Sequence, residues 1–205
     1  MYIPKQYKQE DKEAIAQLVR EFGFATLISA NNHTPLATHI PLELEITGEE
    51  WILHGHMARA NPQWKAFETN PQVLAIFMGP HTYVSPSWYN HRNVPTWNYM
   101  AAHLSGTVRL IESPALEQQL RKLMARYENT HAEKPQGYDE IPAKTLEIDL
   151  RGVVGFKIQV EKIEASYKLS QNRDVESYAN VIEHLKKLKA YDAERIATEM
   201  ANRKK

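Results

Sequence analysis

The stretch Thr38-His39-Ile40-Pro41-Leu42-Glu43-Leu44-Glu45-Ile46 alternates with a period of two residues. In a β-strand this period places Thr38 and the four aliphatic residues on one face, and His39, Pro41 and the two glutamates on the other. Pro41 has no N–H to give to a neighbouring strand, so we expect an open side or a bulge there. The stretch therefore predicts a strand with one apolar face.

Strand patterns continue on both sides of this stretch. Residues 24–29 precede it, across a hairpin turn expected at residues 31–33, and residues 51–56 follow it. The nearly continuous apolar run at residues 73–78 predicts a buried central strand, which Gly79-Pro80 is expected to end.

Two more alternating segments follow. Residues 104–110 predict one strand, and residues 154–169 predict another. In the second, the apolar phase changes near Glu161-Lys162, which implies a bulge or a bend. The patterns add up to about six or seven strands.

Helices are predicted around these strands. Asp11 is expected to cap a helix with a single apolar stripe, and a short helix is expected near residues 63–68. Ser113-Pro114 predicts a further helix, with Ser113 as N-cap and a buried stripe that reaches Tyr127. A polar loop is expected at residues 129–138.

The C-terminal end is also predicted to be helical, with Asp174 and Asp192 each capping one helix. We find no internal repeat and no linker in the sequence. The pattern favours a mainly β fold with peripheral α-helices, namely an antiparallel barrel with helices at its rim.

Composition narrows the class of protein. The chain has 205 residues, 42% of them hydrophobic, and a formal net charge of zero, which is typical of a globular protein and gives no overall electrostatic footprint for nucleic acid. Without cysteine, disulfides and thiolate sites are excluded. No apolar run approaches membrane length, so a cytoplasmic protein is the expectation.

The segment Leu53-His54-Gly55-His56-Met57-Ala58-Arg59-Ala60-Asn61-Pro62-Gln63-Trp64 joins a predicted strand to a predicted helix. Donors that converge on a helix N-terminus suit an anionic group such as a phosphate. A second run of donors, residues 168–173, precedes the Asp174 cap. Across the two segments, Arg59, Lys168 and Arg173 supply positive charge. The polar side chains between Lys168 and Arg173 supply directional hydrogen bonds.

Five aromatic residues gather between residues 83 and 99 and offer flat surfaces for a ring system. Together with the donor runs, and without a glycine-rich phosphate loop, they favour a nucleotide-type cofactor held by a barrel. The plain alternative is that Arg59 and Lys168 are surface charges and that the tryptophans pack in the core. His54 and His56 share a strand face, but no carboxylate accompanies them in that segment, so we predict no metal site. No catalytic residue is identified by its chemistry.

Several ordered motifs resemble those of the PaiB family. They are Met1–Pro4, Ala37–Leu42, His56–Trp64, Tyr83–Tyr89, Val94–Tyr99 and Lys168–Arg173. This family is described as FMN-binding negative transcriptional regulators, linked in Bacillus-type bacteria to the control of protease synthesis and sporulation. The resemblance implies a split β-barrel like that of the pyridoxamine-phosphate-oxidase-like flavoproteins, with FMN near a homodimer interface. It also implies an FMN-binding domain at residues 1–173 and a helical extension at residues 174–205.

The resemblance also implies the cofactor-binding residues. The FMN phosphate and ribityl chain would meet the segment around Arg59, Ala60 and Asn61, with Lys168, Ser170, Gln171 and Asn172 as a second phosphate group. The expected border of the flavin ring comprises Thr38, His39, Tyr83, Val84, Ser85, Trp88 and Trp97, and His56 completes the expected set.

Three functions compete at this stage. The first is a flavin-binding repressor, although no helix-turn-helix is readable. Its DNA surface would be the basic C-terminal helices, with Lys186, Lys187, Lys189, Arg195, Arg203, Lys204 and Lys205. The second is an FMN-dependent oxidoreductase that acts on a small molecule. The third is a haem-binding protein that uses the histidines.

Overall fold

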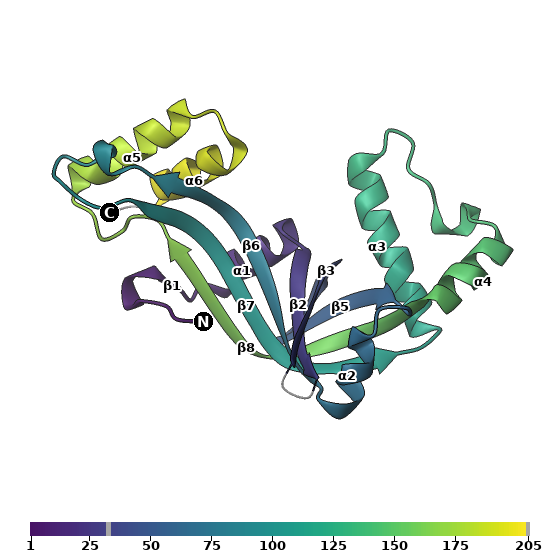
Figure 1. The fold of residues 1–205 in the computed structure, drawn as a ribbon. Coiled ribbons are helices and arrows are strands. Elements are labelled where there is room, and N and C mark those ends of the chain that lie inside the picture. The colour runs from purple at the N-terminus through teal and green to yellow at the C-terminus, as the bar shows by residue number, and fades with distance from the viewer. Residues whose placement is uncertain (32–33, 204–205) are drawn as a thin grey trace. The chain divides into compact units, whose positions relative to one another are not determined.

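A computed structural model of the chain describes residues 1–31 and 34–203 (Figure 1). The hairpin turn predicted at residues 31–33 includes Asn32 and His33, which lie outside the described residues. The chain divides into two compact units, and each is described by itself. Unit 1 comprises Met1–Phe22, Phe77–His103 and Ile163–Lys205, and unit 2 comprises Gly23–Ile76 and Leu104–Lys162.

Strands and helices contribute about equally to the described residues. The strands are β1 Lys8–Gln9, β2 Phe24–Asn31, β3 Thr34–Pro41, β4 Glu43–Thr47, β5 Glu50–Ala58, β6 Gln72–Val84, β7 Thr96–Ile111 and β8 Val153–Lys168. The helices are η1 Lys5–Tyr7, α1 Lys12–Glu21, α2 Gln63–Thr69, η2 Pro86–Trp88, α3 Ala115–His131, η3 Tyr138–Glu140, α4 Ala143–Gly152, α5 Val175–Lys187 and α6 Tyr191–Asn202.

The strands form one sheet in the order β3-β2-β6-β7-β8-β5-β4, with β1 beside β8. The registers of β2 with β3, of β4 with β5 and of β5 with β8 are all antiparallel. β3 and β4 are the two ends of this order, so the sheet is open. The predicted mainly β architecture with surrounding helices is confirmed, with eight strands where six or seven were predicted.

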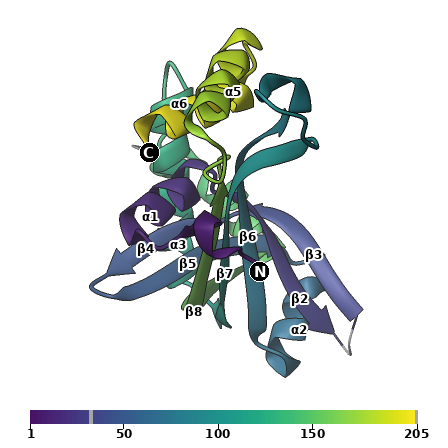
Figure 2. The same ribbon diagram turned by 90° about the vertical axis from the view of Figure 1, so that its left-hand side faces the viewer.

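Unit 2 contains the stretch that alternates from Thr38 to Ile46. The structure breaks it into two strands at Leu42, whose N–H donates to the Gly23 carbonyl at 2.8 Å. The interruption directly after Pro41 is the local effect expected of a residue that cannot donate to a ladder. Figure 2 shows β2 and β3 as a hairpin with α2 next to it. The core of this unit includes Leu27, Leu53 and Phe156, none of which is exposed.

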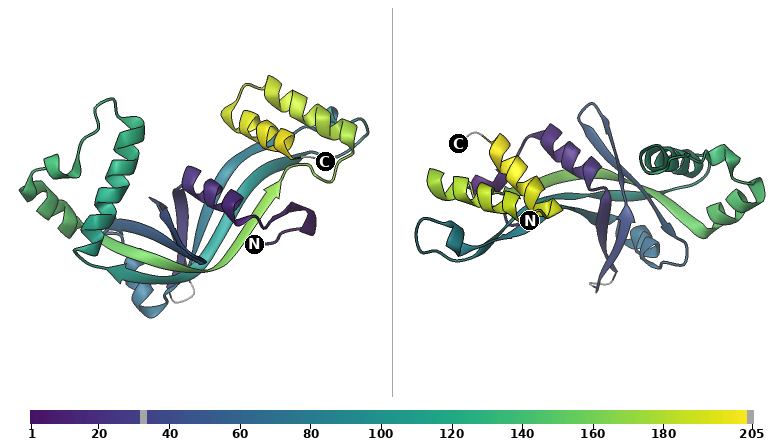
Figure 3. Two further views of the ribbon diagram at one scale, coloured as in Figure 1. Left: turned by 180° about the vertical axis from the view of Figure 1, so that it is seen from behind. Right: turned by 90° about the horizontal axis from the view of Figure 1, so that it is seen from above.

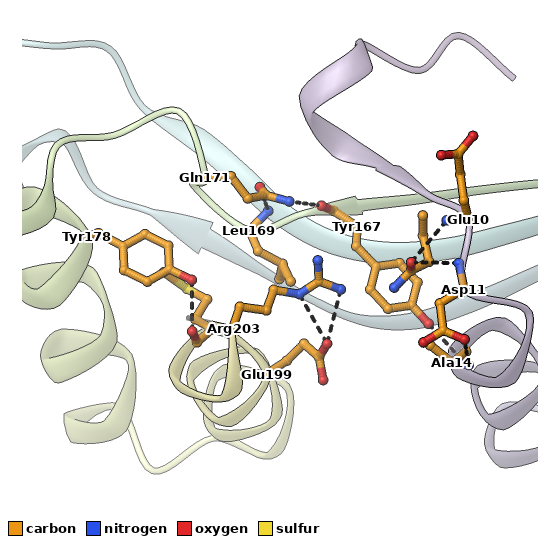
Figure 4. A network of polar contacts seen from close by, with 11 residues as sticks. Glu10, Asp11, Ala14, Tyr167, Leu169, Gln171, Tyr178, Glu199 and Arg203 are labelled. Carbon is orange, nitrogen blue, oxygen red and sulfur yellow. Dashed lines mark hydrogen bonds and ion pairs between the residues drawn. The ribbon is translucent and has the colours of Figure 1, made fainter. Parts of the chain in front are cut away.

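Unit 1 contains both C-terminal helices, which lie side by side (Figure 3). The Tyr178 hydroxyl donates to the Met200 carbonyl at 2.8 Å and so joins α5 to α6. The Tyr167 hydroxyl donates to the Ala14 carbonyl in α1 at 3.0 Å, and the Arg203 guanidinium lies 5.1 Å from the Tyr167 ring (Figure 4). Tyr167 thus connects the end of β8 with both terminal segments of the chain.

Three strands contribute to both units. β6 passes from unit 2 to unit 1 after Ile76, β7 passes from unit 1 to unit 2 after His103, and β8 returns to unit 1 after Lys162. Along β8 the buried side chains change from even positions, such as Phe156, to odd positions, such as Tyr167. The predicted phase change near Glu161-Lys162 is therefore confirmed, and it coincides with the boundary between the units.

The prediction that Gly79-Pro80 ends a strand is wrong, because β6 continues to Val84. A Cβ on Gly79 would lie 2.6 Å from Leu18 Cδ1, so glycine serves close packing here and not a turn. Within the described residues, the register of β6 with β2 covers only Leu74–Ile76. Pro80 lies beyond this register with β2, and a proline is tolerated in a strand where the adjoining ladder has ended.

The helix predictions need five corrections. α1 begins as predicted, with Asp11 accepting from the Glu13 and Ala14 N–H groups, and Asp174 caps α5 by accepting from the Ser177 N–H. Pro114, not Ser113, precedes α3, and of its predicted stripe only Leu116 is buried. α3 continues to His131, inside the predicted loop. α4 was not predicted. α6 follows Ala190, and Asp192 does not cap it. The Asp192 carboxylate instead lies 3.6 Å from His81 Nδ1.

Over the residues that the structure describes, no helix is both long enough and apolar enough to cross a membrane.

Candidate functional site

The predicted cofactor residues fall into both units, and each group is built up separately. In unit 2, Thr38 from β3 meets Asn61 from the loop before α2. The Asn61 Nδ2 donates to Thr38 Oγ1 at 2.9 Å, and Thr38 Oγ1 in turn donates to Gln63 Oε1. The Gln63 N–H donates to Asn61 Oδ1 at 3.0 Å. These bonds hold the start of α2 against β3 and present a fixed polar surface.

Gln63 is the anchor of this group. Its side chain is 2% exposed, and its Nε2 donates to the Leu27 carbonyl at 3.0 Å and to Ser29 Oγ at 3.2 Å. A buried amide needs such partners, because an unpaired one is costly. The sequence prediction did not include Gln63 in the site, although it lies inside the quoted segment from Leu53 to Trp64.

Arg59 is fixed by main-chain acceptors. Its Nε donates to the Arg151 carbonyl at 2.8 Å and its Nη2 to the Val153 carbonyl at 2.9 Å, while its N–H donates to the Gly152 carbonyl. The Trp64 Nε1 donates to the Arg59 carbonyl at 2.9 Å. Arg59 therefore secures the junction of α4 and β8, although the residue is exposed. Ala60, beside it, is exposed.

The histidines of unit 2 lie on different surfaces. His39 is exposed on the face of β3 opposite to Thr38, with Thr26 Oγ1 3.0 Å from its Nδ1 and the Phe24 ring stacked 6.4 Å away. His54 and His56 share the outer face of β5 and are half-buried. Burial lowers the pKa of His56, and burial also lowers that of His54 against the opposing charge of Glu45.

In unit 1, the second predicted donor group surrounds a cavity of about 120 Å³. The residues that line it are Tyr7, Val94, Pro95, Thr96, Asn98, Lys168, Ser170, Asn172 and Arg173. Lys168 and Asn172 were predicted to bind the cofactor, and Arg173 follows directly. None of these lining residues is acidic, so within the described residues the cavity is cationic.

The turn after β8 shapes this cavity. Ser170 has a φ of 60° and is 3% exposed; its Oγ donates to Asn98 Oδ1 at 3.1 Å and accepts from Asn98 Nδ2 at 3.0 Å. The predicted residue Gln171 points elsewhere. Its Nε2 donates to the Tyr167 carbonyl at 2.5 Å, and its Oε1 accepts from the Leu169 N–H at 2.7 Å, so it closes the turn (Figure 4).

Two cations share the cavity. The Lys168 ammonium donates to Thr96 Oγ1 and lies 5.9 Å from the Tyr7 ring, while the Arg173 guanidinium lies 4.6 Å from the Tyr89 ring. Burial, and then the charge of Arg173, lower the pKa of Lys168. A bound anion would relieve both effects, because it offers each cation an opposite charge and the hydrogen bonds lost on burial.

The predicted aromatic border lies on the hairpin formed by β6 and β7. Tyr83 and Trp97 are 45% and 54% exposed, and their rings meet edge to face with centroids 6.1 Å apart. Val84 is fully buried, and Ser85 Oγ accepts from the Ser87 N–H at 3.3 Å. Trp88 stacks on His184 of α5 at 5.2 Å. Only Tyr83 and Trp97 therefore present open ring surfaces.

Asn98, Thr96 and Tyr7 were not predicted as site residues. Asn98 and Thr96 lie inside the quoted motif from Val94 to Tyr99, so a signal for them existed. Tyr7 lies far from the rest of the cavity in the sequence, and no local pattern distinguishes it from a core tyrosine.

Comparison with known proteins identifies the family. Residues 1–162 match the family model FMN_bind_2, described as "Putative FMN-binding domain". Protease synthase and sporulation protein PAI 2 of Bacillus subtilis is 42% identical over 205 residues, covering 100% of this chain and 99% of the relative. The protein YKL070W of Saccharomyces cerevisiae is 32% identical over 134 residues, covering 54% of this chain and 79% of that protein.

Solved structures share the fold. The flavocytochrome Anf3 from Azotobacter vinelandii gives a TM-score of 0.61 at 17% identity, covering 87% of this chain and 78% of that one. The FAD and haem binding protein from Mycobacterium smegmatis gives 0.58 at 15% identity, covering 84% and 78%. These likenesses establish the fold alone. The domain match and the full-length relative together show that this chain belongs to the PaiB family, with an FMN-binding domain over residues 1–162.

Proposed function

We propose that this protein binds FMN with its phosphate in the cavity beside Lys168 and that it represses genes for protease synthesis and sporulation. The family membership supports the cofactor. The regulatory role is supported by the full-length likeness to PAI 2, whose name refers to both processes. When bound, FMN supplies electron-transfer chemistry, and the protein supplies binding and orientation.

The cationic cavity carries the proposal. Its volume of about 120 Å³ suits a single phosphate group, because pockets for whole ligands usually measure about 300–1,000 Å³. Lys168 and Arg173 would neutralise the phosphate, and Asn172 and Ser170 would offer polar contacts at its edge. These residues lie beyond the family match, but within the part of the chain that aligns with PAI 2.

The flavin ring would meet the predicted aromatic residues of the same unit, because Tyr83 and Trp97 offer open aromatic surfaces. Val84, Ser85, Trp88 and Gln171 stay in the proposal as neighbours within unit 1. For Val84 and Gln171 this can only be through the main chain, since their side chains face the core and the turn. The predicted residues of unit 2, namely Thr38, His39, His56, Arg59, Ala60 and Asn61, are a separate flavin-contact proposal, in which Thr38 and Asn61 offer a fixed polar surface.

A titration of the purified protein with FMN and with riboflavin tests the phosphate site. We expect FMN to bind more tightly, because riboflavin has no phosphate, and we expect Lys168→Met to remove most of that advantage, about tenfold or more. Lys144→Met, at an exposed lysine in α4, is the control and should leave both affinities unchanged. An FMN advantage that survives Lys168→Met would refute the phosphate site, and failure to bind either flavin would refute the cofactor.

DNA binding is proposed for the basic surface of α5 and α6. Lys187 pairs with Glu183, Arg195 with Glu21 and Arg203 with Glu199. Lys186 and Lys189 are exposed, and Lys204 and Lys205 lie outside the described residues. The ion pairs reduce the charge available to a phosphate backbone, so we expect Lys186 and Lys189 to matter most.

Gel-shift measurements over a range of salt concentrations test this surface. Binding to the promoter DNA of protease or sporulation genes should weaken with salt and weaken further in the double variant Lys186→Gln, Lys189→Gln. Lys144→Gln serves as the matched control. Binding that is unchanged in the double variant would exclude this surface, and the lack of salt-dependent binding would count against direct repression.

A homodimer is part of the same proposal. Val94, Trp97 and Tyr83 are large apolar residues that remain exposed on unit 1 and would gain from burial. Sedimentation velocity should show a dimer, and Trp97→Ser should shift it toward the monomer. A monomeric wild-type chain at micromolar concentration would contradict this part of the proposal.

A further inference from the structure

A larger cavity, of about 440 Å³, lies in unit 2 on the outer face of β4, β5 and β8, beside the first turns of α3. Its lining residues are Glu43, Leu44, Glu45, His54, Ile111, Ala115, Gln118, Gln119, Lys122 and Lys157. None of them belongs to the predicted cofactor set. The volume is in the range of pockets that hold whole small molecules, about 300–1,000 Å³.

The strand register sets a row of three chemically different side chains along the floor of this cavity. Glu43 on β4 pairs with His54 on β5, and His54 pairs with Lys157 on β8. Neighbouring strands are about 4.8 Å apart, so the row runs from a carboxylate to an ammonium over about 10 Å of backbone. Burial lowers the pKa of the His54 imidazole between them and so favours its neutral form.

Two buried acceptors in the lining of the cavity lack donors. Gln119 is 8% exposed, and its Oε1 has no hydrogen-bond partner within the described part of the chain. The same holds for Glu43 Oε1, although Glu43 Oε2 accepts from Arg126. Leaving an acceptor buried and unpaired costs about 1–3 kcal/mol, so native proteins keep few of them without a ligand or a water molecule. The cavity is therefore suited to a ligand that donates hydrogen bonds.

The lining also offers a cation. No ion pair to Lys157 is found in residues 1–31 and 34–203, whereas Lys122 lies 3.8 Å from Glu45. The lining carries two glutamates and two lysines, so its net charge is zero although its charges are separated. Ile111 and Ala115 add an apolar wall. A ligand with one positive end, one negative end and an aliphatic body matches all three features.

We propose that this cavity binds a small zwitterion, namely an aliphatic α-amino acid or a short peptide with an aliphatic side chain. Its ammonium group donates to Glu43 Oε1 and Gln119 Oε1, and its carboxylate faces Lys157. The side chain packs on Ile111 and Ala115. The inference uses no residue of the FMN site and stands or falls without it.

Isothermal titration calorimetry on the full chain saturated with FMN tests the inference. The probes are L-leucine and L-leucylglycine, with L-leucinamide, which has no carboxylate, and N-acetyl-L-leucine, which has no ammonium group. We expect at least one zwitterion to bind, and both blocked derivatives to bind at least tenfold more weakly, because each loses one end of the charge match. If neither zwitterion binds, the proposal is overturned; it is also overturned if a blocked derivative binds as well as its parent.

Two variants locate the binding. Gln119→Leu and Lys157→Met should each weaken the binding of the zwitterion at least tenfold, whereas Gln17→Leu and Lys144→Met, at exposed positions, should not. Gln119→Leu removes an unpaired acceptor, so we expect it to fold at least as stably as the wild type, which separates loss of binding from loss of fold. Binding that both variants retain would overturn the assignment. A zwitterion that binds only when FMN is absent would also overturn it, because the cavity would then belong to the flavin.

Discussion

The side-chain amide of Gln63 donates a hydrogen bond of 3.0 Å to the main-chain carbonyl of Leu27, a residue with no exposed surface. The bond ties the first turn of α2 to the middle of β2. It also fixes the orientation of the Gln63 Oε1, which accepts from Thr38. The polar surface around Thr38 and Asn61 therefore depends on a glutamine that is itself buried.

Replacing Gln63 should therefore destabilise the fold. In Gln63→Leu the Leu27 carbonyl and the Ser29 hydroxyl lose a buried donor, at a cost of about 2 kcal/mol in the free energy of unfolding. Urea unfolding followed by circular dichroism measures it. Gln17→Leu, on the exposed side of α1, should change the same quantity by less than about 0.5 kcal/mol. Equal effects of the two variants would show that the amide bonds contribute nothing.

Arg59 should contribute to stability as well as to any ligand contact. Arg59→Lys removes the forked hydrogen bonds to the Arg151 and Val153 carbonyls while it keeps the charge, so we expect a loss of about 1 kcal/mol. Chemical denaturation without flavin measures this effect separately from binding. Arg92→Lys, on an exposed loop, is the control. A stable Arg59→Lys variant with weakened FMN binding would assign the guanidinium to the cofactor instead.

His56 should make the fold sensitive to acid. Burial lowers the pKa of His56 in the folded state below its ordinary value of 6.5, so the folded state favours the neutral imidazole. This contribution is fully present above pH 6.5 and is lost as the pH falls through the folded pKa. Between about pH 8 and about pH 5, the free energy of unfolding should fall less in His56→Gln than in the wild type. His131→Gln, at an exposed histidine, should follow the wild type.

Tyr167 should make the fold sensitive to alkali. Burial raises the pKa of Tyr167, so the folded state favours the neutral phenol. Its contribution is fully present below the ordinary tyrosine pKa of about 10 and is lost as the pH rises toward the folded value. Tyr167→Phe should lose about 1 kcal/mol near pH 7, where the hydroxyl bonds to Ala14, but decline less between about pH 9 and about pH 11. Tyr2→Phe, at an exposed ring, should show neither effect.

Elements governed by local rules were predicted well from the sequence. The Asp11 side chain caps α1 because its own oxygen accepts from the next turn, and the phase change in β8 is visible as a change of apolar parity. Elements governed by distant contacts were not. Gly79 stays in a strand because Leu18, far away in the sequence, packs against it. Asp192 does not cap α6, and its carboxylate lies near His81.

The candidate site shows the same division. Lys168 and Asn172 were predicted as donors from a local run, and they do line one cavity. Tyr7 joins them only through the fold. Gln171 belongs to the same run, yet its side chain closes the turn after β8, because a glutamine can bond to its own main chain. Sequence identifies the kinds of donor present, whereas the orientation of each donor depends on its neighbours in the fold.

The passage of β6, β7 and β8 through both units has a consequence for synthesis and dissection of the chain. Each unit is assembled from separate stretches, so no uninterrupted fragment consists of one unit alone. Unit 2 becomes complete once Lys162 has been made, whereas unit 1 waits for the C-terminal helices and still needs the first residues of the chain. Truncation after α4 would therefore remove β8 from both cores, whereas two fragments cut after Lys162 would have to reassociate before the core of unit 1 could form.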